Sequence, residues 1–137
     1  MPRIVLDTNM FVSIFVFGGM VETIIDLFIA NKLQLYTSPA LINEILKKLR
    51  EFEVNKKVIA DVTEFLERGI VVIPQVVISV CRDPKDNFLL ELAETAQADY
   101  IITQDKDLLD LPDQRWKETQ IVKPEAFLHI LRETKLI

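Results

Sequence analysis

The chain has 137 residues, of which 50% are hydrophobic and 27% charged, and its formal net charge at pH 7 is −5. This length favours one domain spanning residues 1–137, with enough apolar material for a buried core. The acidic balance argues against a dedicated nucleic-acid binder unless the local charge differs from the total. With Cys81 as its only cysteine, the chain has no intrachain disulfide and no cysteine-based zinc site, which suits a cytoplasmic protein.

A short apolar run, Arg3–Leu6, opens the chain and leads into the polar residues Asp7, Thr8 and Asn9. A continuous apolar run of this kind predicts a strand that is buried on both faces. Asp7 would then lie at the carboxyl end of the strand, where open α/β sheets bind ligands. The same polar residues could instead serve only as the cap of the next helix.

Helical apolar patterns follow over residues 9–16 and 21–30, with a break near the two glycines between them. The apolar run from Met10 to Met20 is too short to cross a bilayer, and no basic segment precedes it as a signal peptide requires. We therefore expect no membrane segment here. The part over residues 11–17 predicts either an ordinary core helix or a contact between copies of the chain.

Residues 33–36 predict a second strand, and Ser38-Pro39 then marks a helix start, with Ser as the N-cap and Pro in the first turn. That helix is expected to run to about Phe52. At ~100° per residue, Glu44 lies at the border of its apolar face. An acidic side chain is therefore expected close to the core.

A basic cluster falls in this helix and in the next one, which Asn55 caps and Gly69 ends. Its members are Lys47, Lys48, Arg50, Lys56 and Lys57. The usual interpretation of such a cluster is a solvated helix face. The alternative is a local positive surface for nucleic acid on an otherwise acidic chain.

Residues 70–73 predict a β-branched strand, and Asp83-Pro84 then predicts a helix that runs through about Ala96. Asp86 falls in the middle of the apolar face of this helix. A carboxylate that faces inward without a partner is costly to bury. Either Asp86 helps to satisfy the helix start, or it belongs to a site.

Residues 100–103 predict another buried strand, and Asp105 follows it as Asp7 follows the first strand. Asp107 comes next in a short turn or helix, before a last strand over residues 119–122 and a closing helix over residues 124–131. Strands that alternate with helices predict an α/β sandwich with a mainly parallel sheet.

Four acids therefore follow predicted strands or lie near predicted helix starts: Asp7, Glu44, Asp86 and Asp105. Parallel strands bring these positions to one rim, so all four can converge. Carboxylates about 4 Å apart repel by roughly 4 kcal/mol per pair at an effective dielectric of 20, so such a cluster needs protons or a cation. All-oxygen ligation suits Mg²⁺ or Mn²⁺, with Thr8, Asn9 and Thr103 as supporting hydrogen-bonding groups.

Other chemistries lack their parts. His129 is the only histidine, which excludes a ribonuclease mechanism based on two histidines. The chain has no nucleophile-elbow motif, P-loop or dinucleotide-binding glycine motif. A phosphotransferring aspartate of the haloacid dehalogenase type would need a second acid where Asn9 stands.

Four motifs in order resemble those of the PIN domain family, and their spacing matches over nearly the whole chain. They are Leu6-Asp7-Thr8-Asn9, Ser38-Pro39 with Glu44, Arg82-Asp83-Pro84-Lys85-Asp86-Asn87, and Thr103-Gln104-Asp105-Lys106-Asp107-Leu108-Leu109. The opening and the third motif resemble a bacterial subgroup of toxins from toxin–antitoxin pairs, relatives of VapC-type toxins. Gln104 departs from the pattern, because glycine is common there.

The resemblance implies a three-layer α/β/α sandwich and metal-dependent cleavage of RNA by one or two Mg²⁺ or Mn²⁺ ions. The catalytic and metal-binding acids of the family match Asp7, Glu44, Asp86 and Asp105, with Asp107 as an additional metal ligand and Asn9 and Thr103 as supporting polar positions. Candidate contacts to the RNA backbone are Lys47, Lys48, Lys56, Lys57, Arg82 and Lys85.

The implied partners are an RNA substrate, a cognate antitoxin protein and further copies of the chain in a dimer or larger homo-oligomer. Two alternatives stay open. The chain could be a catalytically silent PIN-like module that only binds partners, or, more weakly, a metal-dependent phosphatase acting on small substrates.

Overall fold

The computed structural model describes residues 1–13 and 22–135. These residues form a six-stranded sheet in the order β3-β2-β1-β4-β6-β5. Every neighbouring pair is parallel except the last, because β5 and β6 are antiparallel. The strands are β1 (Arg3–Leu6), β2 (Gln34–Thr37), β3 (Ile70–Val71), β4 (Tyr100–Ile102), β5 (Arg115–Trp116) and β6 (Thr119–Val122).

The helices alternate with the strands along the chain, which gives the three-layer α/β/α fold predicted from the sequence. None of the helices in the described part of the chain combines the length and the apolar character that crossing a membrane would require. The helices are α1 (Thr8–Val12), α2 (Glu22–Ile29), α3 (Pro39–Glu51), α4 (Lys56–Glu67), α5 (Pro84–Ala96), α6 (Lys106–Leu109) and α7 (Pro124–Glu133), with a short 3₁₀ turn, η2 (Pro112–Gln114).

Side-chain caps set the starts of the longer helices, as their sequences predict. Ser38 accepts a hydrogen bond from the backbone N–H of Leu41 at the start of α3, with a donor–acceptor distance of 3.2 Å. Asn55 does the same for Val58 in α4 at 3.0 Å. These bonds satisfy N–H groups that have no partner within the helix.

The core lies around β1 and β4, whose apolar side chains are fully or almost fully buried. Helix α5 packs across β1, β2 and β4 and contributes four apolar residues to this core: Leu89, Leu90, Leu92 and Ala93. On α1, α2 and α4, the rings of Phe11, Phe28 and Phe65 meet edge to face, with centroids 5.8 Å apart for Phe11–Phe65 and 5.0 Å for Phe28–Phe65.

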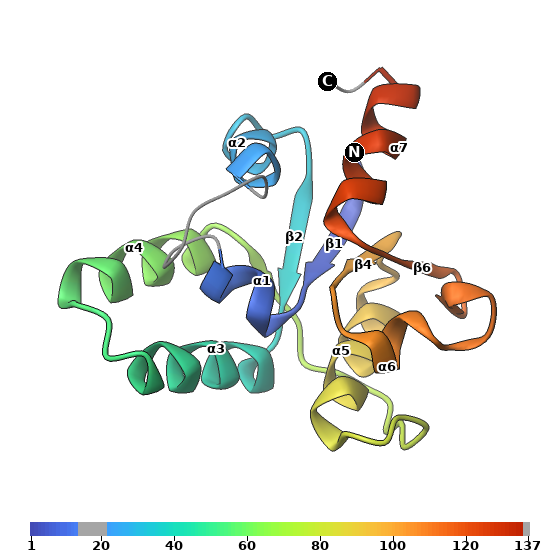
Figure 1. Ribbon diagram of the computed structural model, residues 1–137, viewed down its shortest axis with the longest axis horizontal. Coiled ribbons are helices and arrows are strands. Elements are labelled where there is room, and N and C mark those ends of the chain that lie inside the picture. The colour runs from blue at the N-terminus through green and yellow to red at the C-terminus, as the bar shows by residue number, and fades with distance from the viewer. Residues whose placement is uncertain (14–21, 136–137) are drawn as a thin grey trace.

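The strand order reverses at β1. From β1 the chain first builds β2 and β3 on one side, and it later returns to add β4 and β6 on the other. Strands β1 and β2 point toward the same end of the molecule, where α1, α3, α5 and α6 gather (Figure 1). Open α/β sheets bind their ligands in the crevice at such a reversal.

The structure differs from the sequence-based expectation in two strands. The strand expected over residues 70–73 is only two residues long, Ile70–Val71, and both are exposed. Strand β5 was not expected, because Arg115-Trp116 has no apolar run and pairs only as one arm of a tight hairpin with β6.

Helix α1 is assigned over Thr8–Val12, which overlaps the helical pattern expected over residues 9–16. The rest of that prediction, including most of the segment expected to form a core helix or an intermolecular contact, falls on residues 14–21, outside the described residues.

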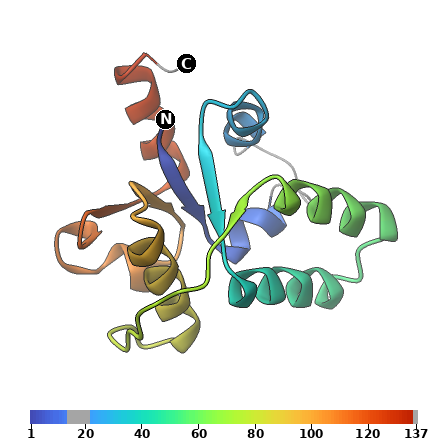
Figure 2. The same ribbon diagram turned by 180° about the vertical axis from the view of Figure 1, so that it is seen from behind.

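An extended segment over residues 72–81, here called the α5 strap, connects β3 to α5 and lies along that helix (Figure 2). Three backbone N–H groups of the strap, spaced three residues apart, donate hydrogen bonds to three side chains of α5, spaced four residues apart. The strap and the helix run in opposite directions. The pairs are Gln75 with Thr95, Ile78 with Glu91 and Cys81 with Asn87, at 3.0, 2.9 and 2.9 Å. The strap is therefore held mainly by the helix, and its first residue, Val72, also donates a backbone hydrogen bond to Thr37 of β2 at 2.8 Å.

Substituting Glu91 by Ala should loosen the centre of the strap. The half-buried Ile78 N–H would lose a charged acceptor, and a lost bond of this kind costs about 1–2 kcal/mol of unfolding free energy. We expect faster hydrogen exchange at the Ile78 amide and a lower urea midpoint. Glu94→Ala on the same helix is the matched control, since the Glu94 side chain makes no hydrogen bond to the strap in the described structure. Unchanged exchange at Ile78 would contradict the strap's dependence on Glu91.

Candidate active site

Asp7 and Thr103 lie side by side because the strands they follow are neighbours in register, with Leu6 opposite Ile102. Both side chains are buried. The Thr103 hydroxyl donates a hydrogen bond to Oδ2 of Asp7. The other carboxylate oxygen, Oδ1, accepts from the backbone N–H of Met10 at 3.0 Å, so Asp7 also caps α1. The orientation of Asp7 is thus set from two directions.

The same Thr103 hydroxyl connects Asp7 to a second acid. Its oxygen accepts a hydrogen bond from the backbone N–H of Asp105 at 2.9 Å. Asp105 in turn caps the short helix α6, because its Oδ1 accepts from the backbone N–H of Asp107 at 2.9 Å. One buried hydroxyl therefore links the ends of β1 and β4 to the start of α6.

Asp86 lies in the first turn of α5 and is only 6% exposed. It is buried together with Leu89 and Ala93, as expected from its place on the apolar face. Asp83, and not Asp86, caps this helix, through a bond from the Lys85 N–H at 3.0 Å. Within the described structure, the buried Oδ2 of Asp86 has no hydrogen-bond partner. Asp86 is therefore not explained by the helix start.

Three carboxylates form a cluster at this point. One oxygen from each of Asp86, Asp105 and Asp107 lies within 4.8 Å of the others. Burial, the adjoining Asp105 carboxyl and the charges of nearby acids together raise the pKa of Asp86 to about 7. Burial also raises the pKa of Asp7, although the hydrogen bonds from Thr103 and Met10 oppose the rise. Both effects mark a place where negative charge is held at a free-energy cost.

The cluster fits a hard divalent cation. A buried carboxylate oxygen without a partner is satisfied by a metal ion as well as by a proton, and three converging carboxylates are ligands that Mg²⁺ and Mn²⁺ accept. Burial and the neighbouring acids raise the pKa of Cys81 to about 11, which keeps this thiol protonated at neutral pH. Asp86, Asp105 and Asp107 would hold the ion, with Asp7 beside them.

A cavity of about 140 Å³ opens next to the cluster. Thr8 and Asn9 lie on its wall, as does Glu44 from α3. The charged residues that line it are the acids Asp7, Glu44, Asp83, Asp86 and Asp105 and the lysines Lys48 and Lys85. The structure thus brings the four predicted acids to one cavity, although neither Asp7 nor Glu44 is among the three clustered carboxylates.

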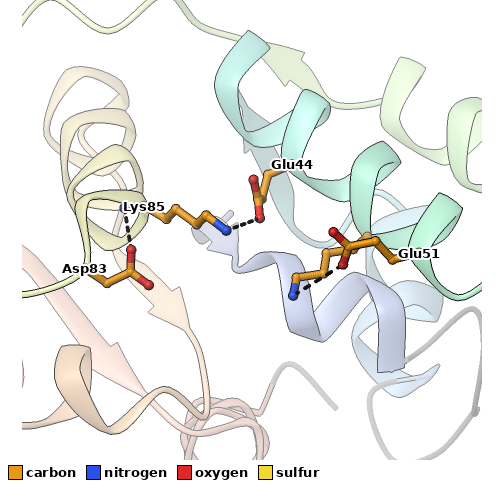
Figure 3. Close-up of polar contacts among 5 residues, drawn as sticks. Glu44, Glu51, Asp83 and Lys85 are labelled. Carbon is orange, nitrogen blue, oxygen red and sulfur yellow. Dashed lines mark hydrogen bonds and ion pairs between the residues drawn. The ribbon is translucent and has the colours of Figure 1, made fainter.

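Glu44 has a partner of its own. Lys85 extends from the start of α5 toward α3, and its Nζ lies 3.1 Å from Oε1 of Glu44 (Figure 3). The hydrogen bond and the charge of Glu44 raise the pKa of Lys85. This ion pair was not predicted, because it depends on how two helices far apart in sequence are placed. The adjacent Asp83, expected only as a cap, also reaches the cavity wall.

The predicted basic residues are divided between two places. Lys48 and Lys85 line the cavity, and Arg82 lies 3.8 Å from Asp107 at its edge. Lys47 is exposed on α3. Lys56 and Lys57 begin α4, which starts at the end of α3 that is remote from α5 (Figure 1). The basic cluster of the sequence is therefore not one surface patch at the cavity.

Without metal, replacing Asp86 by Asn should stabilise the protein at pH 8. The folded carboxyl keeps its proton up to about pH 7, whereas an unfolded one releases it near 3.8, so the contribution of Asp86 to stability falls as the pH rises between these values. We expect a gain of about 1–2 kcal/mol at pH 8, less than the full shift implies because the cavity is open to water, and almost none at pH 4.

Urea unfolding in EDTA at both pH values measures this difference. Asp61→Asn, on the exposed face of α4, is the matched control and should show no gain that depends on pH. Added Mn²⁺ should reverse the order at pH 8, because it stabilises only the protein that retains the carboxylate. Equal stability of the wild type and Asp86→Asn in EDTA at pH 8 would contradict the charge conflict at Asp86.

Comparison with known proteins places this geometry in a family. The family model described as PIN domain matches residues 3–107. Uncharacterized protein MJ1680 of Methanocaldococcus jannaschii is 34% identical over 119 residues, which cover 82% of this chain and 76% of that protein.

Among solved structures, the fold is similar to the crystal structure of VapBC2 from Rickettsia felis bound to a DNA fragment from their promoter. The TM-score is 0.61 at 12% identity, and the match covers 88% of this chain and 97% of that one. At this identity the likeness concerns the fold alone. The family match and the relative show that the chain belongs to the PIN domain family.

Proposed function

We propose that the chain is an endoribonuclease that hydrolyses RNA phosphodiester bonds with the help of Mg²⁺ or Mn²⁺. The observation that carries the proposal is Asp86, whose buried Oδ2 has no partner in the described structure and whose carboxylate lies in a cluster with those of Asp105 and Asp107. A cation relieves this arrangement and gives the cavity a charge that a phosphate can approach. PIN domains are generally nucleases, which supports hydrolysis as the reaction.

Each acid has a separate task in this proposal. Asp86, Asp105 and Asp107 hold the ion. When bound, a divalent ion lowers the pKa of water and offsets the negative charge of the phosphate. Asp7 is fixed by Thr103 and Met10, so it can orient a water molecule or a further ligand without moving. Glu44 completes the set of catalytic acids with Asp7, Asp86 and Asp105 and would help to orient the water, and Thr8 and Asn9 support the cavity wall.

The basic residues are proposed to contact the RNA backbone. Lys48, Lys85 and Arg82 lie at the cavity, where they can bind the phosphates next to the scissile bond. The remaining lysines lie farther from the cavity: Lys47 is on α3, and Lys56 and Lys57 begin α4. They would contact more distant phosphates. Such contacts strengthen binding through release of counterions, so binding should weaken as salt rises.

Asp7→Asn should abolish most cleavage and leave the fold intact. The amide can still cap α1 and hydrogen-bond to Thr103, but it lacks the negative charge with which Asp7 would orient the attacking water. With protein freed of metal and then supplied with saturating Mn²⁺, we expect the cleavage rate of a mixed RNA pool to fall about a hundredfold or more.

Asp61→Asn, which is remote from the cavity, should cut at the wild-type rate. Cleavage by the wild type should stop in EDTA and return with Mn²⁺, and sequencing the products would map the sites. Undiminished cleavage by both Asp7→Asn and Asp86→Asn would rule out the assigned site. Mn²⁺ binding by the wild type without any cleavage of RNA would identify a silent binding module instead.

We further infer that the chain acts as the toxin of a toxin–antitoxin pair. Two observations support this: the sequence motifs resemble those of VapC-type toxins, and the similar fold is that of VapBC2, a protein solved on a DNA fragment from its promoter. An antitoxin and a second copy of the chain are the proposed partners.

Co-expression with the product of the adjacent small gene tests this proposal. We expect a stable complex in size-exclusion chromatography and loss of RNA cleavage within it. The chain by itself should sediment as a dimer or larger species. Failure of any neighbouring gene product to bind the chain or to suppress cleavage would remove the toxin assignment and leave the nuclease assignment in place.

A further inference from the structure

The charges of the cavity are arranged in two unlike halves. In one half, oxygens of Asp86, Asp105 and Asp107 converge within 4.8 Å, and the buried Oδ2 of Asp86 has no partner in the described structure. In the other half, Glu44 lies on α3 and is bonded to the ammonium group of Lys85 at 3.1 Å. The clustered acids therefore need a cation, whereas Glu44 already has one in the ammonium group of Lys85.

The first turn of α5 supplies a charged side chain to each half of the cavity. Lys85 and Asp86 are consecutive in its first turn, and consecutive helical side chains point about 100° apart. Asp86 consequently turns inward to the clustered acids. Lys85 instead extends toward α3 and meets Glu44 there, as Figure 3 shows. The cap bond from the Lys85 N–H to Asp83 fixes the backbone from which the side chain extends.

The other two cations near the cavity are not held in this way. Lys48 lies 3.9 Å from Glu51, one turn farther along α3, and so is directed away from Glu44. Arg82 lies 3.8 Å from Asp107, but its side chain is 87% exposed. Lys85 makes the shortest of these contacts, and its partner Glu44 is the least exposed of the three acids, at 19%.

An ammonium group at hydrogen-bond distance occupies Oε1 of Glu44 and offsets the charge that would attract a metal ion to this carboxylate. A divalent ion at Glu44 would have to displace Lys85 and then remain close to its positive charge. We propose that Lys85 takes the place of a second divalent ion, so that the chain binds one metal ion at the clustered acids and offers the Lys85 ammonium to the RNA phosphate. This inference rests on the proposed nuclease function, and it specifies how that site is charged.

The number of bound Mn²⁺ ions tests the proposal directly. Full-length protein freed of metal would be titrated with Mn²⁺ by calorimetry, and bound Mn²⁺ would be counted by electron paramagnetic resonance. We expect one ion per wild-type chain and two per Lys85→Met chain, the second binding at least tenfold more tightly than any second ion in the wild type. Lys48→Met removes the same charge from the same cavity and should still bind one ion.

A double variant, Lys85→Met with Glu44→Gln, identifies the position of the second ion. It should return to one bound Mn²⁺, because the carboxylate exposed by the loss of Lys85 is then absent. Thermal unfolding of each variant in EDTA would establish that all are folded. Two ions in the wild type, or one ion in Lys85→Met, would overturn the proposal.

RNA binding gives a second readout that does not require turnover. In an Asp7→Asn background with Mn²⁺, Lys85→Met should weaken the anisotropy-measured affinity for a labelled single-stranded RNA about tenfold, and an unchanged affinity would overturn the phosphate contact. Failure of the nuclease assignment is distinguishable from failure of this inference. If the wild type binds one Mn²⁺ but cuts no RNA, only the nuclease assignment fails. If it cuts RNA with two ions bound, only the inference about Lys85 fails.

Discussion

Strands β1 and β4 lie side by side in the middle of the sheet, and their pairing with Leu6 opposite Ile102 places Asp7 next to Thr103. The rest of the site is assembled on this pair. The Thr103 hydroxyl bonds to Asp7 and to the N–H of Asp105, so the acid after each strand is positioned by the same buried group. Because the strand order reverses at β1, the helices that follow the strands leave a crevice at this rim. The sheet topology therefore creates the cavity, and the acids that follow the strands line it.

The two halves of the cavity show two solutions to the same electrostatic problem. Glu44 is neutralised by Lys85, a cation supplied by the chain itself. Asp86 lies among apolar side chains with a carboxylate oxygen that has no partner in the described structure, and its pKa is raised to about 7. A leucine at that place would pack without any such conflict. The strain is tolerated because the sheet and α5 are held together by a large apolar core.

Much of the site could be predicted from residue types and spacing. Apolar runs located the strand ends at Asp7 and Asp105, and the helical repeat placed Asp86 on the buried face of α5. The α5 strap could not be predicted, because an extended segment bonded to helix side chains has no sequence period of its own. The spacing of the basic residues did not show which of them reach the cavity: Lys48 lines it, whereas Lys56 and Lys57 begin α4 at the end of α3 that is remote from α5 (Figure 1). Nearness in sequence fixes where two residues of the same helix or strand lie relative to each other. The relative positions of residues on different elements depend on how those elements pack.

The order of the strands in the chain has a consequence for when the candidate site can form during synthesis. A nascent chain that has emerged only as far as β3 can pair β3, β2 and β1, but the other edge of β1 is still bare. Asp7 then has neither Thr103 nor any of the three clustered acids near it. Those groups come later in the chain, on α5, after β4 and on α6, so they join Asp7 only after these elements have been made. The proposed site is consequently incomplete until the chain through α6 has been made.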